Sequence, residues 1–262
     1  MRKEIIGDAT LYLGDCREVL PVLEPASVDM LWTDPPYGHK NHDGDLNARL
    51  NEHRNLESKP IANDGAAEMR EIVDFALVEA TRILKPDCCC CCCCCGGGGP
   101  SPTFAWVADR MDSKGLSFFH AVVWDKNNPG LGWRYRRQYE MVMVSHLKGG
   151  KLAWNGDEGA VANIFKMMPP RERKHPNEKP LQLVLQFVRK HTTPGDLIID
   201  PFMGSGTTGV AALQLGRKFI GIELDPEYFD VACRRMEEAV NSVGLLSMCK
   251  RPAELKQGLL IG

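Results

Sequence analysis

The chain has 262 residues, of which 44% are hydrophobic and 25% charged, and its formal net charge is −2. This composition is typical of a globular protein with a sizeable core, and it excludes a disordered chain or a globally basic coat protein for nucleic acid. Apolar runs fall short of the ~18 residues that span a bilayer, and acidic residues come too early for a signal-peptide core. We therefore expect a cytoplasmic protein without a membrane partner.

The first element that bears on function is a short strand predicted over Val28 to Thr33, which ends at Asp34-Pro35-Pro36-Tyr37 because proline cannot continue a strand ladder. Residues 38–62 are polar and aperiodic, and we expect a mobile loop there. Apolar residues then recur at helical spacing from Met69 to Leu84, and Pro86 is expected to close that helix.

Eight of the eleven cysteines are consecutive, from Cys88 to Cys95, and four glycines follow them. Same-face neighbours in a strand lie ~6.6 Å apart, so a strand alone does not bring four thiolates to one zinc ion at ~2.3 Å. Free cysteine packs as a small hydrophobe, and an unbroken apolar run is typical of a central parallel strand. We predict a buried strand, with a metal-binding or redox tract as the alternative.

The second half of the chain alternates between strands and helices. Two strands, Phe118 to Trp124 and Tyr139 to Ser145, flank a basic turn, and residues 148–174 are irregular. Pro180 is expected to begin a helix that extends through Val188. Such alternation predicts a mostly parallel sheet that is covered by helices on both faces.

A strand over Leu197 to Ile199 leads into a glycine-rich turn that begins at Asp200, and a helix through Val210 to Leu215 follows. The next strand, Phe219 to Ile222, ends at Glu223, and Asp225 and Pro226 are expected to cap a helix to about Val240.

This strand, turn, helix, strand and terminal acid predict a nucleotide-binding unit. Glu223 lies 23 residues after Asp200, close to the ~20 expected between such a turn and a ribose-binding carboxylate. Gly204, Gly206 and Gly209 leave an NAD fingerprint open, but the Asp200 carboxylate would repel a pyrophosphate at the helix N-terminus. A cationic cofactor without phosphate, such as S-adenosylmethionine, is therefore favoured.

The Asp34-Pro35-Pro36-Tyr37 turn follows a parallel strand, where open α/β sheets bind their ligands. The Asp34 carboxylate and the Pro35 carbonyl form a rigid acceptor pair for the two hydrogens of a primary amine on a planar base. Tyr37 can stack on that base, as aromatic side chains do with flipped nucleobases. The alternative is that the tetrapeptide is only a turn.

Taken together and in this order, Asp34-Pro35-Pro36-Tyr37 and Asp200-Pro201-Phe202-Met203-Gly204-Ser205-Gly206-Thr207 resemble the motifs of the DNA amino-methyltransferases, in the circularly permuted β-class. Gly14-Asp15-Cys16 and His175-Pro176-Asn177-Glu178-Lys179-Pro180 also match family elements, so the resemblance spans roughly Ala9 to Val240.

The resemblance implies one methyltransferase domain over residues 1–262. The implied fold is a Rossmann-like, seven-stranded, mostly parallel α/β sheet with one reversed strand. Asp34, Pro35, Pro36 and Tyr37 would form the amine site, and no metal is expected. Asp15 would bond the cofactor adenine, Glu223 the ribose, and the His175–Pro180 stretch would cover the methionine part. The cofactor residues implied in full are Asp15, Cys16, His175, Lys179, Pro180, Asp200, Pro201, Phe202, Gly204, Ser205, Gly206, Thr207, Glu223 and Leu224.

The implied reaction is methyl transfer from S-adenosylmethionine to the N6 amine of adenine in double-stranded DNA, because cytosine-N4 members more often carry serine at the position of Asp34. The target base stays open between adenine and cytosine, as do a homodimer and a cognate restriction nuclease. A non-catalytic nucleic-acid-binding regulator and an NAD oxidoreductase are the competing interpretations.

Residues 124–174 carry ten Lys and Arg against five Asp and Glu, so we expect one face to meet a polyanion, with a solvated basic loop as the alternative. Residues 148–174 would be a short target-recognition segment. The candidates for phosphate contacts are Arg134, Arg136, Arg137, Lys148, Lys151, Lys166, Arg171, Arg173 and Lys174. Trp124, Trp133 and Trp154 are interpreted as core residues, and His39, His42 and His53 as solvated loop residues.

Overall fold

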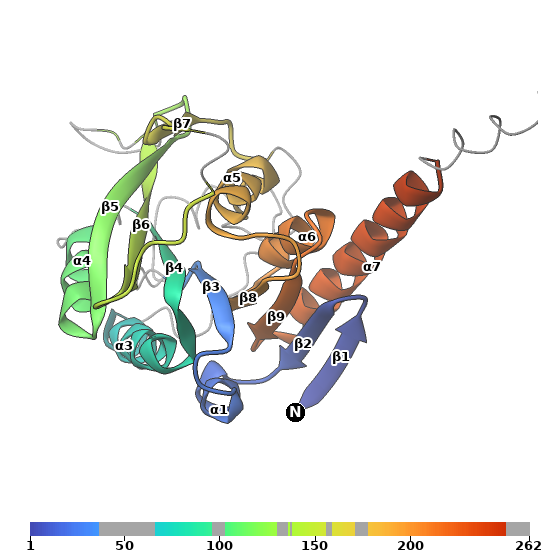
Figure 1. The fold of residues 1–262 in the computed structure, drawn as a ribbon, viewed down its shortest axis with the longest axis horizontal. Coiled ribbons are helices and arrows are strands. Elements are labelled where there is room, and N and C mark those ends of the chain that lie inside the picture. The colour runs from blue at the N-terminus through green and yellow to red at the C-terminus, as the bar shows by residue number, and fades with distance from the viewer. Residues whose placement is uncertain are drawn as a thin grey trace, which may run out of the picture.

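The computed structural model describes residues 1–36, 66–95, 103–129, 136, 138–155, 159–170 and 178–249. In these parts of the chain, nine strands form one sheet in the order β1-β2-β9-β8-β3-β4-β6-β5-β7 (Figure 1). The strands are β1 (Arg2–Ile6), β2 (Ala9–Leu13), β3 (Val28–Thr33), β4 (Leu84–Cys95), β5 (Leu116–Asp125), β6 (Tyr139–Leu147), β7 (Ile164–Lys166), β8 (Leu197–Asp200) and β9 (Lys218–Glu223).

The seven central strands, β2 to β5 in sheet order, confirm the predicted fold class. Among them only β6 is reversed, since it pairs antiparallel with both β4 and β5. The predicted strand count was too low for the whole sheet, because β1 adds an antiparallel edge strand beside β2 and β7 adds a parallel one beside β5. Strand β3, which leads into Asp34, precedes β8, which ends at Asp200, in the chain and is paired with it in the sheet, as the permuted order requires.

Helices cover both faces of this sheet (Figure 1). One core contains the buried side of α5 (Leu181–His191), α6 (Thr207–Gln214) and α7 (Pro226–Cys249), packed on Trp32 and Cys89 of the sheet. The other contains α1 (Cys16–Val19), η1 (Leu20–Val22), α3 (Ala66–Ile83) and α4 (Thr103–Ser113), packed on Leu31 and Cys90. Helix α7 runs beyond the predicted Val240, since no proline interrupts it. No described helix is long and apolar enough to cross a membrane.

The cysteine tract lies in a buried central strand, as predicted. Cys88 to Cys92 are all 0% exposed within β4, which pairs with β3 on one side and β6 on the other. The interpretation of Pro86 was wrong. The helix already ends at Ile83, and Pro86 lies inside β4, where the register against β3 slips between the Val28–Leu84 and Met30–Cys89 pairs. A bulge of this kind accommodates a residue that has no N–H to donate.

The direction of the strands decides where a ligand can bind. Strands β2, β9, β8, β3 and β4 are mutually parallel, so their carboxyl ends meet at one edge of the sheet. Open α/β sheets bind ligands in the crevice at this edge.

Candidate active site

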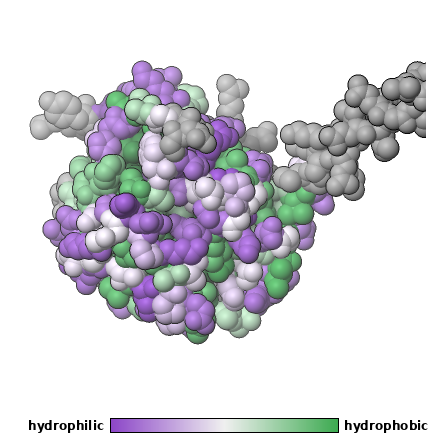
Figure 2. Space-filling view, viewed as in Figure 1, coloured by the Kyte–Doolittle hydropathy of each residue, from purple (hydrophilic) through white to green (hydrophobic). Residues whose placement is uncertain are grey.

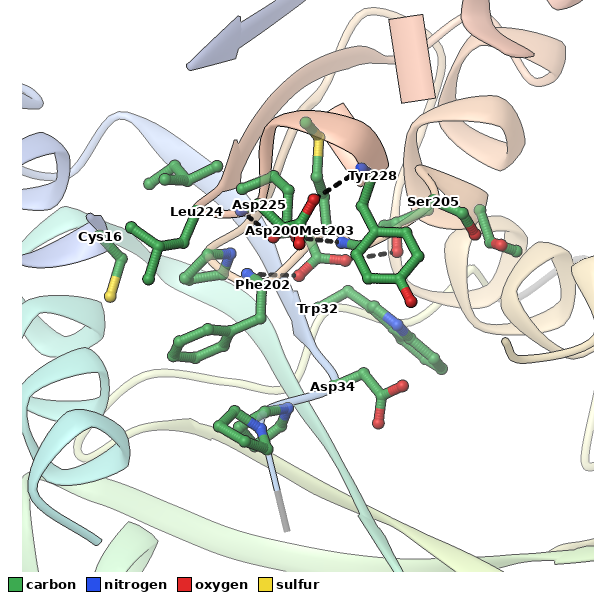
Figure 3. A pocket seen from close by; sticks show the side chains of 18 of the residues that line it. Cys16, Trp32, Asp34, Asp200, Phe202, Met203, Ser205, Leu224, Asp225 and Tyr228 are labelled. Atoms are coloured by element: carbon green, nitrogen blue, oxygen red, sulfur yellow. Dashed lines mark hydrogen bonds between the residues drawn. The ribbon is translucent and has the colours of Figure 1, made fainter. Parts of the chain in front are cut away.

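A cleft of about 320 Å³ opens at the carboxyl edge of the sheet. Its walls lie at the carboxyl ends of four parallel strands: Gly14 to Cys16 at β2, Asp34 to Pro36 at β3, Asp200 to Ser205 at β8 and Glu223 to Pro226 at β9. Figure 3 shows Asp34 and Asp200 facing the same cavity, with Cys16, Phe202 and Leu224 grouped at the end away from Ser205 and Tyr228. The Pro-Pro turn and the glycine-rich turn, 166 residues apart, therefore share one cleft.

Backbone hydrogen bonds to a carboxylate hold the glycine-rich turn in place. The N–H of Gly204 donates to Glu223 Oε2 at 2.9 Å, and the N–H of Asp225 donates to Oε1 at 2.8 Å. Gly206 has a φ of +80°, and a Cβ there would lie 2.9 Å from the Cβ of Ala232, so only glycine fits the turn. A carboxylate oxygen has about two lone-pair positions, so each Glu223 oxygen can still accept a hydroxyl.

Three carboxylates, those of Asp34, Asp200 and Glu223, give the cleft a strongly acidic interior. Burial raises the pKa of Asp200 to about 7, and Asp34 and Glu223 push it in the same direction. Hydrogen bonds from the Thr208 hydroxyl at 2.6 Å and the Phe202 N–H at 3.1 Å oppose that rise. Burial also raises the pKa of Glu223. A cationic ligand would relieve this repulsion, whereas a pyrophosphate would add to it.

The Asp34 carboxylate is held by a buried lysine. Lys179 Nζ lies 2.6 Å from Asp34 Oδ2 and 3.4 Å from Glu140 Oε2, and its side chain is 5% exposed. Glu140 forms a second ion pair with Lys126. Charges thus alternate along a chain from the cleft to β5, and the ammonium group keeps Asp34 oriented as an ionised acceptor.

A second network ties the far side of the cleft together. Arg235, from α7, donates to the Ser205 carbonyl at 2.7 Å and to its hydroxyl at 2.8 Å. The same guanidinium forms an ion pair with Glu178 at 2.7 Å. The glycine-rich turn and the segment that leads into α5 are therefore linked through one side chain.

The turn after β2 is stabilised by its own ion pair. Asp15 caps α1 by accepting the Arg17 N–H at 2.8 Å, and it also pairs with the Arg17 guanidinium at 2.6 Å. Arg17 lowers the pKa of Asp15, which keeps this carboxylate ionised. Burial raises the pKa of Cys16 to about 12, so its thiol lines the cleft as an apolar group.

Comparison with known proteins agrees with this geometry. A profile of the N6_N4_Mtase family, described as DNA methylase, matches residues 28–234. The chain belongs to this DNA methylase family. It is 27% identical to type II methyltransferase M.HinfI of Haemophilus influenzae, over all of this chain and 79% of that protein. It is also 28% identical to M2.DpnII of Streptococcus pneumoniae, over 87% of this chain and 89% of that protein.

The fold is also similar to those of solved DNA methyltransferases. The complex of M1.HpyAVI with S-adenosylmethionine shares 26% identity and a TM-score of 0.65, covering 87% of this chain and 98% of that one. The cytosine-N4-specific PvuII DNA methyltransferase has a TM-score of 0.68 at 21% identity, covers 91% of this chain and 92% of that one, and shows the shared fold. This DNA methyltransferase uses S-adenosylmethionine, and the acidic cleft suits that cationic cofactor.

Most of the cofactor residues predicted for the DNA methyltransferase line the cleft, but Pro180 and Gly206 do not, and Lys179 lines it in another role. Pro180 caps α5 and Gly206 shapes the turn without reaching the cavity surface. Lys179 lines the cleft but bonds Asp34. Tyr37 and His175 lie outside the described residues. The predicted residues found in the lining are Asp15, Cys16, Asp34, Pro35, Pro36, Lys179, Asp200, Pro201, Phe202, Gly204, Ser205, Thr207, Glu223 and Leu224.

Sequence reasoning missed several residues of the site. Tyr228 lines the cleft from the first turn of α7, three residues after the Asp225 cap, and that spacing could have indicated it. Glu140 pairs with Lys179, 39 positions away in the chain, and Arg235 pairs with Glu178, 57 positions away. No local signal pointed to either.

The basic residues predicted to contact DNA are divided between two edges of the sheet. Arg136, between β5 and β6, and Lys166, paired with Asp125 at the end of β5, lie at the edge that carries the cleft. Lys148 and Lys151 lie at the opposite edge, because β6 is reversed and its carboxyl end points away from the cleft. Arg134, Arg137, Arg171, Arg173 and Lys174 lie outside the described residues.

The tryptophans have different surroundings. Trp124 is 3% exposed and donates to the Met167 carbonyl, which confirms core packing. The same interpretation was wrong for Trp154, which is 45% exposed and packs edge-on against His191 at the end of α5. Trp133 and the histidines His39, His42 and His53 lie outside the described residues.

Proposed function

We propose that this DNA methyltransferase transfers a methyl group to the N6 amine of an adenine flipped out of double-stranded DNA. The observation that carries the proposal is the position of Asp34, an acceptor carboxylate in the same cleft as the glycine-rich turn. A flipped base that enters this cleft meets the acceptor and the methyl donor together.

The cofactor would lie along the carboxyl edge of the sheet. Its adenine would occupy the apolar end formed by Cys16, Phe202 and Leu224, and its ribose hydroxyls would donate to Glu223. The cationic part would lie near Asp200, whose charge its binding would stabilise. When bound, S-adenosylmethionine supplies a methyl group on a good leaving group, so the protein's task is chiefly to position the two reactants.

The amine would be held by two acceptors, the Asp34 carboxylate and the Pro35 carbonyl. Lys179 occupies one lone pair of Asp34 Oδ2 at 2.6 Å and leaves acceptor capacity on that carboxylate. When the amine donates hydrogen bonds to both acceptors, its nitrogen is drawn toward tetrahedral geometry and its lone pair is aimed at the methyl group. Because the nitrogen becomes cationic before it loses a proton, the carboxylate also stabilises the charge that develops.

The choice of adenine over cytosine rests on Asp34. Cytosine-N4 members of the family more often have serine at this position, whose hydroxyl is neutral. The physics of holding a primary amine suits both bases, so cytosine N4 is the alternative target.

The DNA backbone would approach the carboxyl edge of the sheet, where Arg136 and Lys166 lie. Arg134, Arg137, Arg171, Arg173 and Lys174 are proposed phosphate contacts from the same basic region. Hydrophilic and apolar side chains are interspersed over the face shown in Figure 2, and phosphate contacts from scattered basic residues give affinity with little sequence reading.

Nucleoside mass spectrometry of DNA incubated with the protein and S-adenosylmethionine tests the proposal. We expect N6-methyladenine from the wild type, none from Asp34→Ala, and an unchanged yield from Asp8→Asn, a matched control at an exposed turn. Cofactor binding should persist in Asp34→Ala. N4-methylcytosine as the sole product would refute the choice of adenine, and full activity of Asp34→Ala would remove Asp34 from the mechanism.

A further inference from the structure

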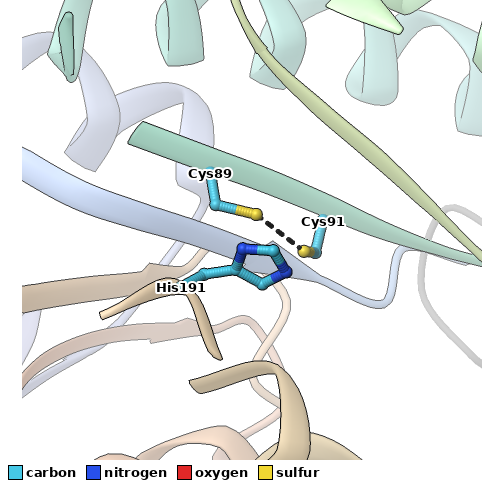
Figure 4. A group of neighbouring side chains, drawn as sticks. All are labelled: Cys89, Cys91 and His191. Atoms are coloured by element: carbon cyan, nitrogen blue, oxygen red, sulfur yellow. Dashed lines mark hydrogen bonds between the residues drawn. The ribbon is translucent and has the colours of Figure 1, made fainter. Parts of the chain in front are cut away.

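Two cysteines and a histidine converge in the core (Figure 4), and none of the three lines the methyltransferase cleft. Cys89 and Cys91 come from β4, and His191 is the last residue of α5. The two sulfur atoms lie 3.2 Å apart, and one ligand atom from each of the three residues lies within 4.8 Å of the others. All three side chains are buried, with His191 only 5% exposed.

The alternation of side chains along β4 selects these two thiols. Cys89 and Cys91 point into the core beneath α5, whereas Cys88, Cys90 and Cys92 pack into the core on the other face. A strand alone thus presents two sulfur atoms to one point, and the histidine from a neighbouring helix supplies a third ligand. A single strand does not bring four thiolates to one zinc ion, but a site shared between β4 and α5 needs only two of them.

The histidine ring is oriented for ligation. Its Nδ1 lies 2.7 Å from the Ala153 carbonyl, which can only accept, so Nδ1 donates this hydrogen bond and Nε2 is the ring nitrogen available to a metal ion. Metal-bound histidines have this arrangement, in which the second nitrogen donates to a carbonyl or carboxylate.

The segment that carries this carbonyl is fixed at both ends. The Ala153 N–H donates to the Cys88 carbonyl at 3.1 Å, and the Asn155 N–H donates to the Lys190 carbonyl at 2.7 Å. The Asn155 side chain caps the end of α5 by donating to the Arg189 and Thr192 carbonyls. Strand, helix end and histidine are therefore held in one arrangement.

We propose that Cys89, Cys91 and His191 form a zinc-binding site that stabilises the fold. On binding, both thiols release their protons to solvent and two Zn–S bonds and one Zn–N bond form. Two thiolates, a neutral imidazole and Zn²⁺ have no net charge, which suits a buried site where an unbalanced charge is costly. The negative end of the α5 dipole also favours a cation beside His191.

A path for the ion and for a fourth ligand lies next to the histidine. His191 lines a second cavity of about 180 Å³, together with Trp154, Phe187 and Lys190. Zinc held by three protein ligands takes water in its fourth position, and this cavity can supply it.

The test is a metal titration of the full chain after reduction and chelation. We expect one equivalent of Co²⁺ to give a thiolate-to-cobalt charge-transfer band, and one equivalent of Zn²⁺ to abolish it and raise the melting temperature. Cys89→Ser, Cys91→Ser and His191→Gln should each weaken binding by about 100-fold or more, at least the loss seen when supporting residues of metal sites are removed.

Cys90→Ser is the matched control, since Cys90 is equally buried in the same strand but faces the opposite core. It should bind Co²⁺ as the wild type does. Circular dichroism of each variant without metal separates a lost ligand from a lost fold. No charge-transfer band in the wild type, or an equal loss in Cys90→Ser and Cys89→Ser, would overturn the proposal, whatever the methylation activity.

Discussion

Cofactor binding should be coupled to a proton at Asp200. This carboxyl is 2% exposed, and its burial raises its pKa from 3.8 to about 7. This rise in pKa means that the site destabilises the ionised carboxylate by on the order of 4 kcal/mol. A cationic cofactor beside Asp200 reverses that preference, so a protonated Asp200 must lose its proton on binding. Below pH 7 the apparent affinity should therefore fall about tenfold for each pH unit.

Isothermal titration calorimetry with S-adenosylmethionine measures this coupling. At pH 6, titrations in buffers of different ionisation enthalpy should show nearly one proton released per cofactor bound, and the number should decline as the pH rises through 7. Asp200→Asn, which cannot ionise, should bind more weakly with no proton released from this position. An affinity that is constant between pH 5.5 and 7.5, with no proton release by the wild type, would show that Asp200 does not lose a proton when the cofactor binds.

The Asp200 carboxyl should also make the stability of the cofactor-free fold depend on pH. Cofactor affinity should rise with pH, whereas this contribution to stability should fall. Between pH 4 and pH 7 the native chain binds the Asp200 proton and the unfolded chain does not, so the contribution of this group to the free energy of unfolding falls as the pH rises. It is fully present below 3.8 and lost as the pH passes about 7. Without cofactor, Asp200→Asn should therefore be more stable than the wild type at pH 8, as urea unfolding would show. A lower stability of the variant at pH 8 would contradict this sign.

Three further predictions concern the networks around the cleft. Lys179→Met removes one partner of a buried ion pair, so the free energy of unfolding should fall by about 3 kcal/mol in urea and turnover should drop; an unchanged midpoint would exclude a structural ion pair. Arg235→Gln should weaken S-adenosylmethionine binding about tenfold, as measured by calorimetry. Arg234→Gln, at an exposed neighbouring position, should leave binding unchanged. Equal effects of the two variants would argue against a role of Arg235 in linking Ser205 to Glu178. Lys166→Ala should lower DNA affinity and reduce the salt slope by about 1, whereas Lys151→Ala at the opposite edge should change neither, with binding measured by fluorescence anisotropy across salt concentrations. A response of Lys151→Ala alone would place the DNA elsewhere.

The arrangement of the sheet and the shared cleft could be predicted from the sequence. Val28 to Thr33 and Leu197 to Ile199 are short apolar runs with polar turns after them, and parallel strands bring such turns to one edge. The buried cysteine strand could be predicted from its unbroken apolar run, since β4 is covered on both faces.

What could not be predicted are contacts between residues far apart in the chain. Lys179 and Asp34 are 145 positions apart, and no pattern around Lys179 indicates its partner. Lys148 and Lys151 were assigned to the DNA face because they share a basic stretch, but the reversal of β6 takes them to the other edge. Trp154 likewise packs against His191 and Lys190, 37 and 36 positions away at the end of α5, and no local pattern indicates those partners.

One cleft should hold the methyl donor and the target amine side by side, with Asp34 accepting a hydrogen bond from that amine. A single-turnover experiment measures the transfer between them: protein loaded with methyl-labelled S-adenosylmethionine is mixed with excess DNA, and label is followed into the DNA. The wild type should transfer about one methyl group per cleft in the first turnover, and Asp34→Asn should keep its bound cofactor and transfer none. Transfer by Asp34→Asn at the wild-type rate would contradict the account.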